Sequence, residues 1–97
     1  MPNLKFQWDP KKAASNASKH QVTFDEAQTV FLDEYALVIL DPEHSAVKDR
    51  FVILGLSAEN RALVVVHCFR EDKSVIRIIS ARKAGTKEQM HYWKNKL

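Results

Sequence analysis

Two arginines lie in a stretch whose other residues are typical of a buried β-strand. Residues 75–82 read VIRIISAR, which places Arg77 and Arg82 among isoleucines and small side chains. An arginine is rarely buried without a partner, because an unpaired charge in apolar surroundings is costly. Its planar guanidinium matches two oxygens of a carboxylate or of a phosphate. The stretch therefore predicts either internal ion pairs or a site for an anion.

The preceding strand candidate, RALVVVHCFR at residues 61–70, is also basic at both ends and contains a histidine. Side chains alternate between the two faces of a regular strand, so Arg77 and Arg82 cannot share a face while their strand stays regular. The carboxylates expected to pair with the arginines are Glu59, Asp72 and Glu88. The residues alone leave the ion-pair and the anion-site interpretations open.

The histidines show no pattern of metal ligands. The chain contains His20, His44, His67 and His91, with Cys68 as its single cysteine. No two histidines lie three or four residues apart, so the spacing argues against a zinc site, and no metal or cofactor is expected. His20 follows Lys19 at the predicted end of a helix. Such a pair complements a helix C-terminus, or supplies a cation and a titratable group to a phosphate site.

Length and composition predict a single domain over residues 1–97 in the cytoplasm. Apolar runs such as ALVIL and ALVVV are far shorter than the roughly 20 residues that span a membrane, so no membrane contact is expected. The N-terminus lacks the features of a signal peptide, and one cysteine cannot form an internal disulfide. Fifteen Lys and Arg against twelve Asp and Glu give a net charge of +3, which suits solubility alone or a polyanionic partner.

The N-terminal third predicts one strand and two helices. Residues 4–8, LKFQW, alternate between apolar and polar side chains, as a short strand does. Asp9 and the proline after it predict a helix that ends near residues 19–20. Thr23 and Glu26 have the spacing of a capping box at the start of a second helix.

The rest of the chain predicts four more strands and a last helix. The strand candidates are residues 36–40, 50–56, 61–70 and 74–81, with turn-forming residues at 41–49. Short polar linkers join the last three strands, as in an antiparallel meander. Thr86 and Gln89 have the spacing of a capping box for a C-terminal helix. The order β-α-α-β-β-β-β-α predicts an α+β fold with a mostly antiparallel sheet of four to five strands.

Three stretches together resemble the BrnT family of toxins from type II toxin–antitoxin systems. They are FQWDPKKAASNASKH at residues 6–20, VTFDEAQTVFLD at 22–33 and DRFVILGLSAENRALVVVHCFREDKSVIRIISARKA at 49–84, so the resemblance covers nearly the whole chain. It implies a small ribonuclease with a RelE-like fold and RNA as substrate. It also implies a BrnA-like antitoxin partner with a ribbon-helix-helix domain, through which alone the complex contacts DNA.

The resemblance further implies an endoribonuclease of the mRNA interferase type, in which the 2′-hydroxyl of the RNA attacks the adjacent phosphate without a metal. Such a reaction needs groups that transfer protons and cations that stabilise the charged transition state. Arg77 and Arg82 are expected to bind the phosphate, His20 to transfer a proton, and Lys19 to support the developing charge. These four residues are the predicted catalytic set.

Four further residues are predicted to help bind the substrate. Arg61 and Arg70 lie at the two ends of the neighbouring strand, and Glu59 and His67 are weaker candidates. Glu59 could instead be an ion-pair partner of Arg61, and His67 could simply fill the strand.

One residue departs from the family pattern. Gln21 stands where the family commonly has glycine, which ends a helix in the left-handed conformation without steric cost. The helix must therefore end at some expense or end differently. Two other functions stay open: a non-catalytic RNA-binding module, which would stack bases on Phe69, Trp8 or Tyr92, and an inactive toxin relative that acts only as antitoxin partner and co-repressor.

Overall fold

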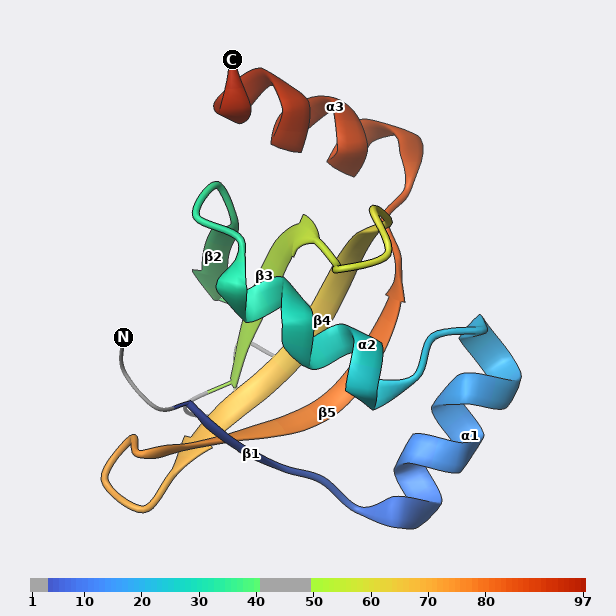
Figure 1. Cartoon of the computed structure of the whole chain (residues 1–97), viewed down its shortest axis with the longest axis vertical. Helices are drawn as coiled ribbons and strands as arrows, with labels where there is room; N and C mark the ends of the chain where they lie inside the picture. The colour runs from blue at the N-terminus through green and yellow to red at the C-terminus, as the bar shows by residue number, and fades with distance from the viewer. Residues whose placement is uncertain (1–3, 41–49) are drawn as a thin grey trace.

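The computed structural model describes residues 4–40 and 50–97, which form a five-stranded mixed sheet with three α-helices (Figure 1). The elements are β1 (Lys5–Gln7), α1 (Pro10–His20), α2 (Phe24–Thr29), the 3-10 helix η1 (Val30–Leu32), β2 (Leu37–Leu40), β3 (Arg50–Leu56), β4 (Ala62–Arg70), β5 (Val75–Lys83) and α3 (Thr86–Lys96). The predicted α+β class and order are confirmed. The turn residues expected at 41–49, with His44, lie outside the described residues.

The strands lie in the order β1-β5-β4-β3-β2. Strands β2 to β5 form the predicted antiparallel meander, while β1 lies parallel to β5. Strand β1 pairs only with Val75, Ile76 and Arg77, so it covers less than half of the outer edge of β5. In the described part of the chain, no helix is long and apolar enough to span a membrane.

A single side chain on α1 continues the edge pairing where β1 stops. Asn16, only 7% exposed, donates from its amide nitrogen to the carbonyl of Ala81 (2.8 Å) and accepts from the Ala81 N–H (3.0 Å). The same nitrogen donates to the carbonyl of Val22 (2.9 Å). The Asn16 amide thus satisfies buried backbone groups as a neighbouring strand would. It fixes α1 beside the C-terminal part of β5, at Ala81.

Helices α1 and α2 and η1 cover one face of the sheet. The core there consists of Val22, Phe24, Ala27, Val30, Ile53, Leu63, Val65, Ile78 and Ala81. Gly55 on β3 allows η1 to approach closely. A Cβ atom on Gly55 would lie 3.0 Å from atoms of Val30, Asp33 and Ala36, so a larger residue would push η1 away from the sheet.

Helix α3 lies across one end of the sheet and packs on the opposite face (Figure 1). Its Tyr92 is fully buried against Val52, Leu54, Val64 and Ala84. The Tyr92 hydroxyl donates to the carboxylate of Asp33 (2.5 Å), which also accepts from the backbone N–H of Leu56 (2.8 Å). Burial raises the pKa of Asp33, but these hydrogen bonds outweigh it and hold the pKa below its usual value.

The start of α3 differs from the sequence prediction. The helix is capped at Gly85, and Thr86 is its first residue rather than its cap. The carboxylate of Glu88 accepts the Gly85 backbone N–H at 2.8 Å. The expected pairing of Thr86 with Gln89 was therefore wrong by one residue, because Glu88 is the carboxylate that reaches back to the first unpaired N–H.

Helix α1 ends in a left-handed residue although that residue is not glycine. Gln21 has φ 56° and ψ 34°, and its N–H donates to the carbonyl of Ala17 at 3.0 Å. Its side-chain amide donates to the carbonyl of Ser18 at 3.0 Å. Of the two expected alternatives, the first is therefore observed: the helix ends in the left-handed conformation at a cost in free energy. The cost arises because a residue with a Cβ is strained in this conformation.

We expect Gln21→Gly to stabilise the fold by roughly 0.5–1 kcal/mol, because glycine adopts the left-handed conformation without strain. The melting temperature should rise by roughly 2–6 °C, as measured by circular dichroism. The matched control is Gln28→Gly inside α2, which should lower it, since glycine weakens a helix interior. An equal loss of stability in both variants would contradict the assignment of strain to Gln21.

Candidate functional site

An irregularity in β5 decides which way its arginines point. The register pairs Val66 with Ser80 but pairs His67 with Ile78. Ile79 is therefore an extra residue on β5, opposite no residue of β4. Such a β-bulge shifts the alternation of side chains by one position on either side of it.

The bulge brings Arg77 and Arg82 to the same face. Arg82 pairs with Val64, and Arg77 pairs with Cys68. Val64 and Cys68 are four residues apart on β4, so they share a face, and directly paired residues do so as well. Both arginines therefore lie on the face that α3 covers only in part. A regular strand would have separated them, as the sequence predicted.

Two cross-strand rows on this face carry four cations. The first row consists of Arg50, Cys68, Arg77 and Gln7. The second row, two residues further along the strands, consists of Arg70, Val75 and Lys5. We call Lys5, Arg50, Arg70 and Arg77 the basic rows. They lie toward the end of the face away from the residues that Tyr92 covers.

Two members of the basic rows were missed in the sequence. Lys5 and Arg50 stand at the first positions of β1 and β3, where a charged residue usually marks only a strand end. The signal that could have found them is the strand register, which aligns them with Arg70 and Arg77. Register is set by pairing between distant segments, and composition does not reveal it.

In the described part of the chain, the charge of Arg77 is not balanced by a carboxylate. Its side chain is partly buried, and one guanidinium nitrogen lies 3.3 Å from the side-chain oxygen of Gln7. Within residues 4–40 and 50–97, neither Arg77 nor the exposed Arg70 forms an ion pair. An amide oxygen does not neutralise a guanidinium, so Arg77 can bind an external anion with two hydrogen bonds.

Arg82 has a carboxylate partner. Two of its guanidinium nitrogens donate to the two oxygens of Glu88, each at 2.8 Å. These hydrogen bonds hold the pKa of Glu88 below its usual value. The side chains of Arg82 and Glu88 are 47% and 36% exposed, so water screens the pair and an anion can reach Arg82 from solvent. One of the carboxylates expected from the sequence is thus the partner of Arg82.

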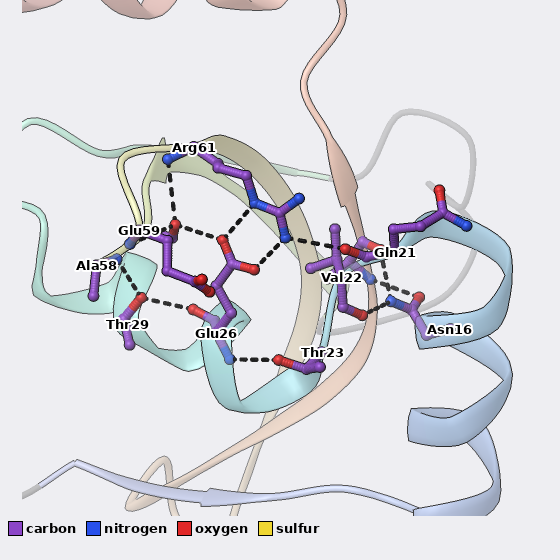
Figure 2. Close-up of polar contacts among 11 residues, drawn as sticks. Asn16, Gln21, Val22, Thr23, Glu26, Thr29, Ala58, Glu59 and Arg61 are labelled. Atoms are coloured by element: carbon purple, nitrogen blue, oxygen red, sulfur yellow. Dashed lines mark hydrogen bonds and ion pairs between the residues drawn. The ribbon is translucent and has the colours of Figure 1, made fainter.

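Arg61 lies on the other face, in a structural network (Figure 2). It forms an ion pair with Glu26 on α2, whose side chain is only 4% exposed. Arg61 also donates to the carbonyl of Gln21 (3.0 Å), and Ser57 donates to the Glu26 carboxylate (2.7 Å). The hydrogen bonds from Arg61 lower the pKa of Glu26 below its usual value. Arg61 therefore joins the turn after α1 and helix α2 to the sheet.

Glu59 and His67 lie apart from the basic rows. Glu59 is exposed in the turn between β3 and β4. His67 is 1% exposed, with its ring edge-to-face against Phe31 at 4.8 Å and Phe69 at 5.6 Å. Burial lowers the pKa of His67, so its ring stays neutral inside an aromatic cluster. The contacts favour a role in packing for His67.

Lys19 and His20 occupy the last turn of α1 and are both exposed. Neither side chain forms a hydrogen bond or ion pair with another described residue. The hydrogen bonds of Asn16 hold the preceding turn against Ala81, the residue before Arg82. His20 is four residues after Asn16, so both project from the same side of the helix. The fold thus brings this turn of α1 beside the end of β5.

The site therefore offers guanidinium groups on an open face and an exposed Lys-His pair beside the strand that carries two of them. Positioned cations of this kind stabilise negative charge that develops on a phosphate. Among the residues that the structure describes, no group of three or more His, Cys, Asp or Glu is arranged to hold a metal ion.

Comparison with known proteins identifies a family. The family model described as "Ribonuclease toxin, BrnT, of type II toxin-antitoxin system" matches residues 8–88. The fold is similar to that of the Brucella abortus ribonuclease toxin BrnT in its crystal structure. The TM-score is 0.67 and the sequence identity 21%, and the match covers 87% of this chain and 100% of that chain. No curated protein matches this chain significantly. Because the family model spans most of the sequence, the chain belongs to the BrnT family of ribonuclease toxins of type II toxin–antitoxin systems.

Proposed function

We propose that the chain is an endoribonuclease of the mRNA interferase type that binds the RNA phosphate on the face shared by Arg77 and Arg82. One observation carries this proposal: the bulge at Ile79 turns both arginines to one face, the face that also carries the basic rows. A bulge that re-aims a side chain is typical of functional sites. The basic rows extend this face by enough positive charge to follow an RNA backbone.

The reaction that suits these groups is attack of the RNA 2′-hydroxyl on the adjacent phosphate. The O–P bond to the 2′-oxygen forms while the bond to the 5′-oxygen breaks. The 2′-hydroxyl loses its proton and the leaving 5′-oxygen gains one, and His20 is the group that transfers a proton in this exchange. Lys19 supports the developing charge from the same turn of α1. Arg77 binds the phosphate oxygens, and Arg82 assists after it leaves Glu88. Proton transfer by a positioned group contributes roughly 10²–10⁴-fold to such a rate.

The other predicted substrate-binding residues divide into two groups in this proposal. Arg70 keeps its predicted role in RNA binding, because it is exposed in the basic rows. The contacts of Arg61 and His67 favour structural roles, and Glu59 lies in the turn next to Arg61. The proposed substrate-binding set is therefore Arg70 with Lys5 and Arg50.

The partner in this proposal is a BrnA-like ribbon-helix-helix antitoxin in the same cytoplasm. It covers the basic face and so blocks RNA, and it carries the complex to DNA. An acidic or hydrogen-bonding inhibitor is complementary to such a surface.

We expect the purified chain to cleave single-stranded RNA in the presence of EDTA, because the substrate supplies its own nucleophile. Fragments should carry a 2′,3′-cyclic phosphate, detected by mass spectrometry. RNA with a 2′-deoxy residue at the cut site is the matched control and should stay intact. Cleavage that requires added magnesium, or that persists at the deoxy site, would contradict the mechanism; binding without cleavage would favour the RNA-binding alternative.

Two arginines on opposite faces should respond in opposite ways to replacement by alanine. Arg77→Ala should lower the cleavage rate by roughly 10²–10³-fold, because it removes a cation aimed at the transition state. Its melting temperature should change little, since among residues 4–40 and 50–97 its side chain hydrogen-bonds only to Gln7. Arg61→Ala should instead destabilise the fold by roughly 2–3 kcal/mol, because it leaves the buried Glu26 carboxylate unpaired.

Both properties are measured on the same preparations, by calorimetry and by initial rates of cleavage. Arg77→Lys keeps the charge but loses the two-pronged geometry, so it should restore activity poorly. A large fall in melting temperature for Arg77→Ala, with activity lost in proportion to folded protein, would assign Arg77 a structural role instead.

We expect the antitoxin to shield Lys19, His20, Arg77 and Arg82, at least in part. Hydrogen exchange of the complex and of the toxin alone should show protection in β5 and in the last turn of α1. Helix α2, on the far face from the basic rows, is the internal control and should exchange equally in both. Full solvent access of the four residues in the complex would contradict this placement.

A further inference from the structure

A pocket of about 480 Å³ lies where β4 ends and the turn to β5 begins. It is lined by Phe51, Phe69, Arg70, Glu71, Asp72 and Lys73. The predicted catalytic residues do not line it. Its lining combines two aromatic rings with two cations and two carboxylates, a mixture that suits a flat, polar-edged ligand.

The apolar part of the pocket is held in place by the core. The rings of Phe51 and Phe69 lie 5.5 Å apart at 65°, and both are partly buried. Each also contacts the buried ring of His67, at 6.1 Å and 5.6 Å. Phenyl rings fixed in this way present a surface on which a nucleobase can stack.

The polar part of the pocket is a turn in an unusual conformation. Glu71, Asp72 and Lys73 all have positive φ, of 49°, 55° and 72°, although none is glycine. Ser74 holds the turn, because its N–H and its hydroxyl both donate to the carbonyl of Glu71, at 3.0 Å and 2.7 Å. Left-handed residues other than glycine are strained, and such strain is concentrated at ligand sites.

The pocket adjoins the basic rows only at Arg70, at the end of β4. Its two phenyl rings lie on the opposite face of the sheet, because Phe51 pairs with His67 and Phe69 lies two residues after His67 on β4. Arg70 belongs to both, since it pairs with Val75 in the second row and lines the pocket. Within the described ranges, the charged side chains from Arg70 to Lys73 form no ion pair with one another. Their hydrogen-bonding groups are therefore available to a ligand whose backbone leaves the basic rows at Arg70 and places a base around the end of the sheet.

We infer that this pocket binds a guanine base of the RNA substrate and so selects the sequence at which the chain cuts. This inference rests on the proposed function. Guanine is the one common RNA base that offers two adjacent N–H donors on its pairing edge, which match a carboxylate of Glu71 or Asp72. Its O6 and N7 atoms accept hydrogen bonds from arginine or lysine, here Arg70 or Lys73. The phenyl rings of the pocket stack on its face.

Binding is tested with the four nucleoside 3′-monophosphates and the ¹⁵N-labelled chain. In NMR titrations, 3′-GMP should shift the amide signals of residues 69–74 and bind more tightly than 3′-AMP, 3′-CMP and 3′-UMP. Phe69→Leu should weaken 3′-GMP binding by roughly ten-fold, because it removes a stacking ring. The control Phe31→Leu changes a ring of the same aromatic cluster outside the pocket and should leave 3′-GMP binding as in the wild type.

Selection is tested by sequencing the ends of a randomised RNA pool after cleavage. The wild type should show guanine at a fixed position relative to the cut. The double variant Glu71→Gln with Asp72→Asn should lose that preference, whereas Glu34→Gln, on another exposed turn, should keep it. Asparagine tolerates the left-handed conformation, so the double variant tests recognition even if Phe69→Leu fails to fold.

The outcomes separate this inference from the proposed function. RNA cleavage without a guanine preference, together with no 3′-GMP shifts at residues 69–74, overturns the inference and leaves the ribonuclease intact. Shifts at these residues with no RNA cleavage by the wild type support the pocket and overturn the proposed function. Pocket variants that escape the antitoxin but keep the wild-type cleavage pattern would assign the pocket to the protein partner and overturn the inference.

Discussion

The pairing of one asparagine amide with one backbone residue determines how the site is assembled. Strand β1 is too short to cover β5, and an uncovered buried edge would leave backbone groups unsatisfied. Asn16 satisfies both groups of Ala81, so α1 must lie against β5 at that height. The third hydrogen bond of Asn16, to Val22, fixes the turn that leads to α2. The position of the Lys-His turn relative to the arginines thus follows from three hydrogen bonds of a single side chain.

The arginines of the sheet differ because their surroundings differ in burial and partner. Arg61 faces a carboxylate that is almost completely buried, so removing Arg61 would leave a buried charge unpaired and destabilise the fold. Arg82 faces an exposed carboxylate, and such pairs contribute only about 0–1 kcal/mol. Among the residues that the structure describes, Arg77 faces only the amide oxygen of Gln7. From Arg61 through Arg82 to Arg77, the guanidinium group is therefore held less strongly by partners within the described chain and is more available to an external anion.

Local sequence signals predicted the helices and strands, whereas contacts between residues far apart in the sequence were not predicted. Asp9, Thr23 and the alternating apolar residues of β3 to β5 act within a few positions, so helix starts and strands could be predicted from sequence. The bulge at Ile79 results from the pairing of β5 with β4, and the residue types at that position do not predict a bulge. The partner of Arg61 was missed for the same reason, because Glu26 lies 35 positions away and reaches it only through the packing of α2. The roles of Arg77, Arg82, Lys19 and His20 stay predictions until variants are measured.

The carboxylate of Glu88 serves two elements at once. It accepts hydrogen bonds from Arg82 on β5 and from the N–H of Gly85 that caps α3. An anion that takes the Arg82 guanidinium removes a partner from this carboxylate and alters the first turn of α3. Coupling of this kind is reciprocal, so a ligand that fixes or displaces α3 changes the affinity of Arg82 for anions by the same factor. The C-terminal helix and the proposed phosphate-binding face are therefore thermodynamically linked through one side chain.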